Sequence, residues 1–202
     1  MNTKSLPVDE HSILESVLIE VVGLNGHHVA EFKRIMFRKR LSKKEFLIRE
    51  GSVCNFIGLV ISGAMRSFVC KGESDEFNND FYFEHDFVSA YTSFLTSSPT
   101  NCNIQALTDV KVVYITSEQY HALVSRDHEW LKLGKHVAET FFVRKCKRET
   151  SFLKNSAAER LESVLKLYPE IEQRVSQYHI ASYLGVKPES LSRIKLLTYI
   201  NK

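Results

Sequence analysis

The chain has 202 residues, of which 44% are hydrophobic and 25% are charged, and its formal net charge is +3. These values are typical of a globular protein of one large or two small domains, and they argue against collagen-like and low-complexity chains. The sequence contains no Cys-x-x-Cys pair, which excludes a zinc ribbon and argues against a dense disulfide framework. We therefore expect reduced thiols in a cytoplasmic protein.

The charge is distributed unevenly along the chain. Residues 1–129 carry a net charge of −4, residues 130–154 carry +5 and residues 155–202 carry +2. An acidic first part and a basic second part suggest that the second part meets a polyanion. The longest uncharged run, residues 87–108, is rich in Ser, Thr and Asn, and no apolar leader opens the chain. We therefore predict neither a membrane span nor a signal peptide.

The hydrophobic pattern predicts helices first and strands next. Apolar residues recur at helical spacing from Ile13 to Val22, and a second short helix is predicted to end near Met36. From about residue 37 the period falls to two, and short apolar runs such as residues 56–61 and 64–70 alternate with turns. These runs predict a small antiparallel sandwich or barrel.

A long helix is predicted after the strands, over residues 129–153. Its first apolar stripe consists of Trp130, Leu133, Val137 and Phe141. Its second stripe consists of Leu131, Ala138, Phe142 and Cys146. Two stripes make an apolar face wider than packing against one neighbour requires. We predict that the first stripe covers the sandwich and the second packs against another copy of the chain. The alternative is that both stripes pack inside one monomer.

The C-terminal part is predicted to begin with a hinge and a short helix. Ser156 can cap this helix, and Glu159 three residues later completes a capping box. Pro169 is predicted to end it. The predicted core face of this helix consists of Ala158, Leu161, Val164, Leu165 and Leu167.

Residues 177–196 have the spacing of a helix-turn-helix. Two short helices that cross steeply need a small residue at the crossing and a residue tolerant of positive φ in the turn. Ala181 and Gly185 meet these two needs. Pro188 suits the first position of the second helix, although Lys187 before it is a poor helix cap. The apolar anchors of the predicted motif are Ile180, Leu184, Val186, Leu191 and Ile194.

The second helix of such a motif enters the major groove of DNA with its N-terminal residues leading. The pattern leaves Glu189 and Arg193 exposed, so the carboxylate can accept from a cytosine amino group and the guanidinium can donate twice to guanine. The alternative is an ordinary ion pair between these two residues on a solvated face. The residues predicted to contact DNA are Ser176, Gln177, Tyr178, Lys187, Glu189, Ser190, Ser192, Arg193 and Lys195.

The order of these elements resembles the Crp–Fnr family of bacterial transcription regulators, most sharply at residues 56–69, 85–115 and 177–195. The resemblance implies an α+β fold in three parts. These are N-terminal helices with a cyclic-nucleotide-binding-like β-roll (a double-stranded β-helix) over residues 1–128, a long dimerisation helix over 129–154, and a small all-α helix-turn-helix domain over 155–202. No β-hairpin wing is evident after the last helix.

The resemblance also implies a function. We expect a cytoplasmic homodimer that binds double-stranded DNA, with RNA polymerase as a further partner, and no enzymatic activity. Glu189 and Arg193 match the base-reading residues of the family, whereas the family's arginine before that glutamate is replaced by Pro188. This replacement removes one donor and changes the preferred DNA site.

The predicted effector pocket departs from the family. Members that bind cyclic AMP carry a Gly-Glu-Leu-Gly turn and an Arg-Ser-Ala or Arg-Thr-Ala segment, which hold the ribose and the phosphate. The matching stretches here, residues 89–92 and 100–102, lack both the carboxylate and the arginine. The acidic run between residues 73 and 86 would also disfavour a phosphate if it lay near. We predict that cyclic AMP is not the ligand, and we expect neither a metal nor another cofactor. The candidate pocket for a different effector consists of Ser89, Ala90, Tyr91, Thr92, Thr100 and Asn101.

Two other classes of protein are alternatives to this interpretation. A cupin-like metal enzyme needs several histidine ligands on its strands, whereas the strand region offers only His85. A ligand-binding or interaction module with a vestigial helix-turn-helix is the remaining alternative, because folding alone would preserve the apolar anchors. The sequence does not distinguish an activator from a repressor.

Overall fold

The N-terminal segment forms two helices that are joined by a π-helical turn. In the computed structural model, which describes residues 8–72 and 75–200, these elements are α1 (Val8–Glu15), η1 (Ser16–Val21) and α2 (Gly26–Ile35). The side chain of Asn25 accepts from the backbone N–H groups of His27 and His28 and so begins α2. Leu14 and Leu18 are fully buried, which confirms the helical interpretation of this segment.

Two four-stranded antiparallel sheets form the β-roll that follows, in the strand orders β1-β8-β3-β6 and β2-β7-β4-β5. Their strands are β1 (Phe37–Leu41), β2 (Phe46–Ile48), β3 (Phe56–Ser62), β4 (Met65–Lys71), β5 (Asp75–Tyr82), β6 (Phe87–Val88), β7 (Asn103–Ala106) and β8 (Val110–Thr116). Helix α3 (Tyr91–Thr96) lies between β6 and β7 in the chain. Side chains that alternate along the strands fill the space between the sheets, among them Ile57, Leu59, Met65, Ile104 and Ile115. The predicted antiparallel sandwich is confirmed.

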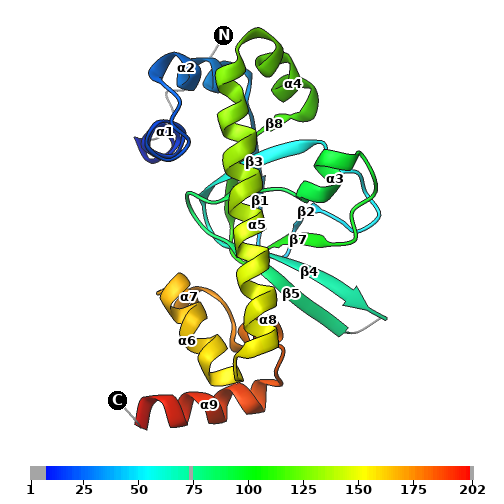
Figure 1. Ribbon diagram of the computed structural model, residues 1–202, viewed down its shortest axis with the longest axis vertical. Coiled ribbons are helices and arrows are strands. Elements are labelled where there is room, and N and C mark those ends of the chain that lie inside the picture. The colour runs from blue at the N-terminus through cyan, green and yellow to red at the C-terminus, as the bar shows by residue number, and fades with distance from the viewer. Residues whose placement is uncertain (1–7, 73–74, 201–202) are drawn as a thin grey trace.

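Helix α5 (Leu131–Lys154) runs along the length of the molecule (Figure 1). It follows α4 (Ser117–Arg126) and a short 3₁₀ turn, η2 (His128–Trp130). The Asp127 side chain accepts from the backbone N–H of Glu129 and begins that turn, so the α-helix starts two residues later than predicted. Leu133 and Val137 are fully buried in the core that the helix shares with the β-roll, and Trp130 is fully buried beside His28 and Phe32 of α2. The prediction for the first apolar stripe is therefore confirmed.

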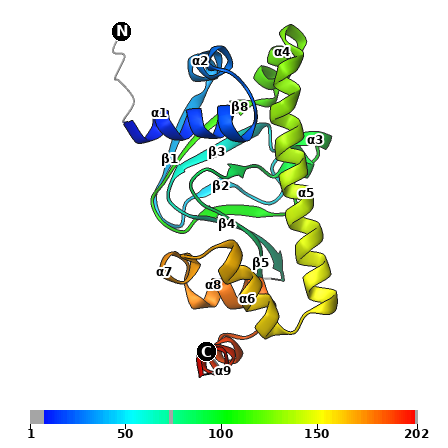
Figure 2. The ribbon, with the colours of Figure 1, turned by 60° about the vertical axis from the view of Figure 1, so that its left-hand side comes forward.

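Four helices form the C-terminal part: α6 (Ala157–Leu167), α7 (Ile171–Arg174), α8 (Gln177–Leu184) and α9 (Pro188–Ile200). In both Figure 1 and Figure 2 they lie at the end of the molecule opposite α2. The capping box of Ser156 and Glu159 is present as predicted.

The predicted core face of α6 is partly wrong. Leu161 and Val164 are buried and Leu165 packs against them, but Ala158 and Leu167 are exposed. The core position after Val164 is filled by Tyr168, the residue that ends the helix. Leu167 lies about 100° around the helix from Tyr168 and so points to solvent. None of the helices formed by the described residues combines the length and the hydropathy that a membrane span requires.

Gly63 makes the tight turn between β3 and β4 with a φ of +96°. A Cβ atom there would clash with the backbone carbonyl oxygen of Asp109, whereas a Cβ atom at Gly51, which has a φ of +83°, would meet nothing within 4 Å. The two glycines thus share a left-handed backbone but differ in the space around them.

We expect Gly63→Ala to lower the free energy of unfolding by at least about 3 kcal/mol, because it adds a backbone clash to the left-handed strain. Gly51→Ala carries only the strain and should cost about 1–2 kcal/mol. Urea unfolding of the two variants measures the difference. Equal losses would show that the close approach at Gly63 contributes nothing.

Candidate functional site

Helices α8 and α9 are joined by a short turn that Gly185 makes possible. Ser176 begins α8 by accepting from the backbone N–H of His179. Gly185 has a φ of +69°, and its N–H and that of Val186 return to carbonyl groups of the last turn of α8. Helix α9 then begins at Pro188. The anchors lie in one apolar cluster, with Ile180, Ala181, Leu184 and Leu191 buried and Val186 and Ile194 packed against them.

The outer side of α9 presents polar side chains to solvent. Glu189, Ser192 and Arg193 are exposed, and Ser190 is half-buried. Among the residues that the structure describes, neither Glu189 nor Arg193 takes part in an ion pair. The ion pair between these two residues, the alternative to base contacts, is therefore not formed. Gln177, Tyr178 and Lys187 are also exposed, near the start of α8 and in the turn.

Lys195 is placed differently from the prediction. Its ammonium group forms an ion pair with Glu172 of α7, and only 19% of its side chain is exposed. The side of α9 that carries Lys195 faces α7 rather than solvent. The expectation that this residue joins the exposed face is therefore wrong.

Helix α8 docks on the free edge of the β-roll. Strand β5 is the last strand of its sheet, so one side of its backbone has no strand partner. The backbone N–H of Asn78 donates to the hydroxyl of Ser182 at 3.0 Å, and that hydroxyl donates to the carbonyl of Glu76 at 2.8 Å. The amide of Asn78 donates to the carbonyl of His179 at 3.0 Å. Helix α8 thus supplies the partners that a further strand would supply.

A buried arginine supports this contact from within the β-roll. Arg66 is 3% exposed, donates to the side-chain oxygens of Gln105 and Asn78, and forms an ion pair with Glu76 at 2.7 Å. Its Nη1 lies 3.2 Å from Nδ1 of His179. Burial, together with the charge of Arg66, lowers the pKa of His179 to about 4. The imidazole is therefore neutral at pH 7, and its Nδ1 accepts from the guanidinium.

Aromatic rings and ion pairs complete the contact between the β-roll and the C-terminal helices. Phe81 packs on Tyr183 and Phe83 on Tyr168, each with ring centroids 5.2 Å apart. The Tyr168 hydroxyl donates to Asp80, whose pKa burial raises to about 6.

Much of the acidic run between residues 73 and 86 lies at this contact, although Asp75 is exposed. Glu84 pairs with Arg174 at 2.7 Å, and Asp86 pairs with Arg144. Glu73 of this run lies outside the described residues.

The candidate effector residues are largely engaged within the fold. The hydroxyl of Ser89 donates to the carbonyl of Phe56, and that of Tyr91 donates to the carbonyl of Gly134. Thr100 is buried and accepts from the backbone N–H of Cys102, and Ala90 is buried as well. Thr92 and Asn101 are exposed. An effector pocket at these residues stays a prediction.

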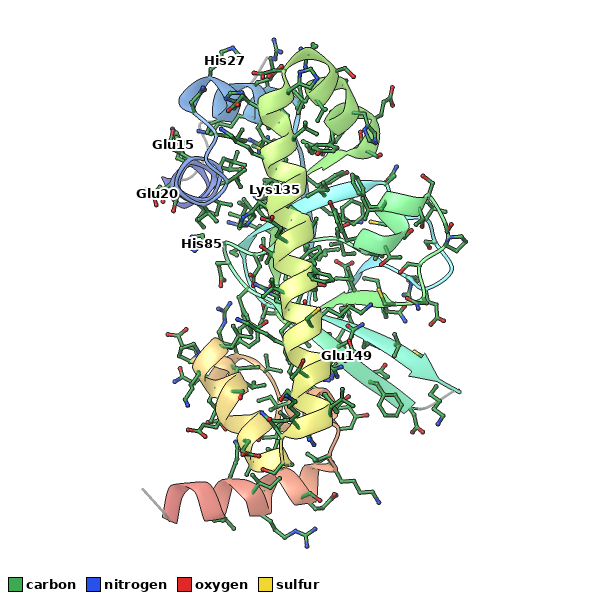
Figure 3. The ribbon with its side chains drawn as sticks, in the orientation of Figure 1. Glu15, Glu20, His27, His85, Lys135 and Glu149 are labelled. Atoms are coloured by element: carbon green, nitrogen blue, oxygen red, sulfur yellow. The ribbon has the colours of Figure 1, made fainter. Side chains whose placement is uncertain are left out.

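The second apolar stripe of α5 is open in the single chain. Phe142 is 68% exposed and Leu131 is 50% exposed, while Cys146 is exposed and Ala138 half-buried. By their helical spacing, Lys135 and Glu149, which are labelled in Figure 3, lie on the same side of α5 as this stripe. The alternative that both stripes pack inside one monomer is therefore wrong.

Comparison with known families gives a match for part of the chain. Residues 38–127 match the family model of the cyclic nucleotide-binding domain. The matched segment is similar to such domains over 90 of the 202 residues. It comprises the β-roll with α3 and α4 and ends just before η2. No curated protein matches the sequence at a significant level.

Solved structures share the fold over most of the chain, beyond this matched segment. FixK2 from Bradyrhizobium japonicum has a TM-score of 0.70 at 17% identity, with 83% of this chain and 86% of that chain covered. The c-di-GMP responsive global regulator CLP of Xanthomonas campestris has a TM-score of 0.70 at 16% identity, with 88% and 93% covered. A protein of Eubacterium rectale assigned to the Crp/Fnr family of transcriptional regulators has a TM-score of 0.67 at 18% identity, with 88% and 85% covered. At these identities the likeness shows the fold alone.

The position of His179 predicts how stability depends on pH. Because its pKa is lowered in the folded state, the unfolded chain binds the proton more readily between about pH 6.5 and pH 4, and stability is lost as the pH falls through this window. Lowering the pH from 7 to 5 should therefore destabilise the parent by about 1 kcal/mol more than His179→Gln. Urea unfolding at the two pH values measures this difference.

Asp80 acts in the opposite direction within the same window, because its raised pKa makes the folded state bind the proton more readily. It is present in parent and variant alike and cancels in the comparison. His121→Gln, which replaces an exposed histidine of α4, serves as the control. If His121→Gln changed the pH dependence as much as His179→Gln, the assignment to the α8 contact would be wrong.

Proposed function

We propose that the chain is a sequence-specific DNA-binding transcription regulator of the Crp–Fnr type. The observation that carries the proposal is the exposed face of α9, a helix anchored from its other side: Glu189, Ser192 and Arg193 are exposed, and neither Glu189 nor Arg193 forms an ion pair with any described residue. The global regulator CLP and the Crp/Fnr-family protein of Eubacterium rectale share the fold, which supports this choice.

In the proposed complex, α9 lies in the major groove and reads base edges. Arg193 donates two parallel hydrogen bonds to a guanine, and Glu189 accepts from a cytosine amino group. Gln177, Tyr178 and Lys187 lie at the start of α8 and in the turn, where they reach the phosphate backbone on either side. Ser190 and Ser192 contact a base edge or a phosphate. Lys195 is omitted because Glu172 holds it.

The proposed regulator is a cytoplasmic homodimer that recognises a pseudo-palindromic site. The exposed stripe with Leu131, Phe142 and Cys146 packs against the same stripe of a second copy. Two α9 helices then meet half-sites about 34 Å apart. RNA polymerase is a further proposed partner. Cyclic AMP is not the proposed effector, since the matching segments lack the ribose carboxylate and the phosphate arginine.

We expect Arg193→Ala to weaken binding to the preferred DNA site by about 1–3 kcal/mol and to relax specificity at one base pair. Fluorescence anisotropy with labelled fragments from upstream of the chain's own gene, at several salt concentrations, measures both effects. Arg34→Ala removes an exposed cation of α2, the helix that lies at the opposite end of the molecule in Figure 1, and should leave binding unchanged. Weak binding that is equal on all fragments would favour the alternative, a ligand-binding or interaction module with a vestigial helix-turn-helix.

We expect Phe142→Glu to convert the dimer into a monomer, because it places a charge in the centre of the proposed apolar interface. Val143→Glu is the matched control, since Val143 is also exposed but lies about 100° further around α5. Sedimentation equilibrium distinguishes the 23.3 kDa chain from twice that mass. A parent that is already monomeric, or a Val143→Glu variant that dissociates equally, would contradict the proposed interface.

A further inference from the structure

A cavity of about 440 Å³ lies at the junction of the C-terminal half of α5 with α6 and α8. Five of its lining residues are cations and none is an acid: Arg144, Lys147, Arg148, Arg160 and Lys166. Three aromatic rings belong to the same lining: Phe152, Tyr168 and Tyr183. The volume is that of a site for a small organic ligand.

Only part of the positive charge around this cavity is paired by acidic side chains of the described residues. Arg144 pairs with Asp86 and Lys166 with Glu162. Within the described part of the chain, Lys147, Arg148 and Arg160 form no ion pair.

The two unpaired arginines are held in place by backbone carbonyls. Arg148 donates to those of Asn78 and Tyr183, and Arg160 to those of Leu184 and Asn155. Carbonyl partners orient a guanidinium but leave its charge uncompensated. Burial is the largest cause that lowers the pKa of Arg148; Tyr183 and Asp80 act in the opposite direction, and the charge of Arg160 makes a smaller contribution that lowers it.

Two guanidinium N–H groups at this cavity also lack an acceptor. Nη1 of Arg144 and Nε of Arg148 are buried, and no described protein atom accepts from them. A buried donor without a partner costs about 1–3 kcal/mol. An oxyanion in the cavity would supply both the missing acceptors and the missing negative charge.

The aromatic residues that line the cavity favour an anion that carries an aromatic ring. The guanidinium of Arg148 lies 4.6 Å from the ring centroid of Phe152 and 5.0 Å from that of Tyr183, and Arg160 lies 4.8 Å from the Phe152 centroid. Rings and planar guanidinium groups thus alternate along one side of the cavity. Both present flat surfaces to a planar ligand.

We propose that this cavity binds a small aromatic anion, a ring system that carries a carboxylate, sulfonate or phosphate group. The acid group meets Lys147 and the two unpaired arginines, and the ring lies against Phe152 and its neighbours. The ligand then contacts α5, α6 and α8 together, so it stabilises the docked arrangement of the C-terminal helices. The site is separate from the proposed dimer face, because Lys147 lies about 140° around α5 from Phe142.

The test uses the full-length chain and a pair of fluorescent dyes. The dye 8-anilinonaphthalene-1-sulfonate is an aromatic anion, and N-phenyl-1-naphthylamine has the same rings without the sulfonate. We expect the anionic dye to bind with one site per chain and at least about tenfold more tightly than the neutral dye. The variant Lys147→Glu should weaken binding of the anionic dye about tenfold and leave the neutral dye unaffected.

Lys145→Glu is the matched control, since it makes the same charge change on an exposed residue of α5 about 160° away from Lys147. Binding of the anionic dye to this variant should equal that to the parent. Equal affinity of the parent for both dyes, or equal losses in the two variants, would overturn the proposal. A fall in dye binding as the chain concentration rises would also overturn it, because a second copy of the chain would then occupy the cavity.

Discussion

The contact of α8 with the edge of β5 decides where the C-terminal helices lie. An edge strand leaves backbone N–H and C=O groups without strand partners, and Asn78 at this edge is fully buried. Each buried group left without a partner would cost about 1–3 kcal/mol, so the hydroxyl of Ser182 and the carbonyl of His179 stabilise the docked position. Since α9 follows α8 after a short turn, the same contact also orients the exposed face of α9.

Many of the acidic and basic side chains that make the charge uneven along the sequence form ion pairs with each other inside the molecule. The acidic residues near β5 meet cations from α5 and from the C-terminal helices, as Asp86 does with Arg144 and Glu84 with Arg174. These pairs hold the two parts of the chain together. The basic surplus of the second part is therefore smaller at its surface than the sequence suggests. Part of what remains lines the cavity beside Lys147.

Each side of helix α5 faces a different part of its surroundings. Its buried side, with Leu133 and Val137, joins the helix to the β-roll. Its open apolar side suits a second copy of the chain, and its C-terminal turns line the cationic cavity with Lys147 and Arg148. A ligand at that cavity and a partner at the open side would both act on one rigid helix. Each would thereby bias the position of α9 relative to the rest of the molecule.

The sequence by itself determined the elements that depend on near neighbours in the chain. The capping box at Ser156, the positive φ of Gly185 and the start of α9 at Pro188 rest on contacts within about four residues, which spacing reveals. Only the tertiary structure decided contacts between distant positions. Asn78 meets Ser182 because folding brings an unpaired strand edge to a helix face, and Glu172 pairs with Lys195 because folding brings α7 next to α9. No local period records such a partner, since burial at one position depends on an element that another part of the chain supplies.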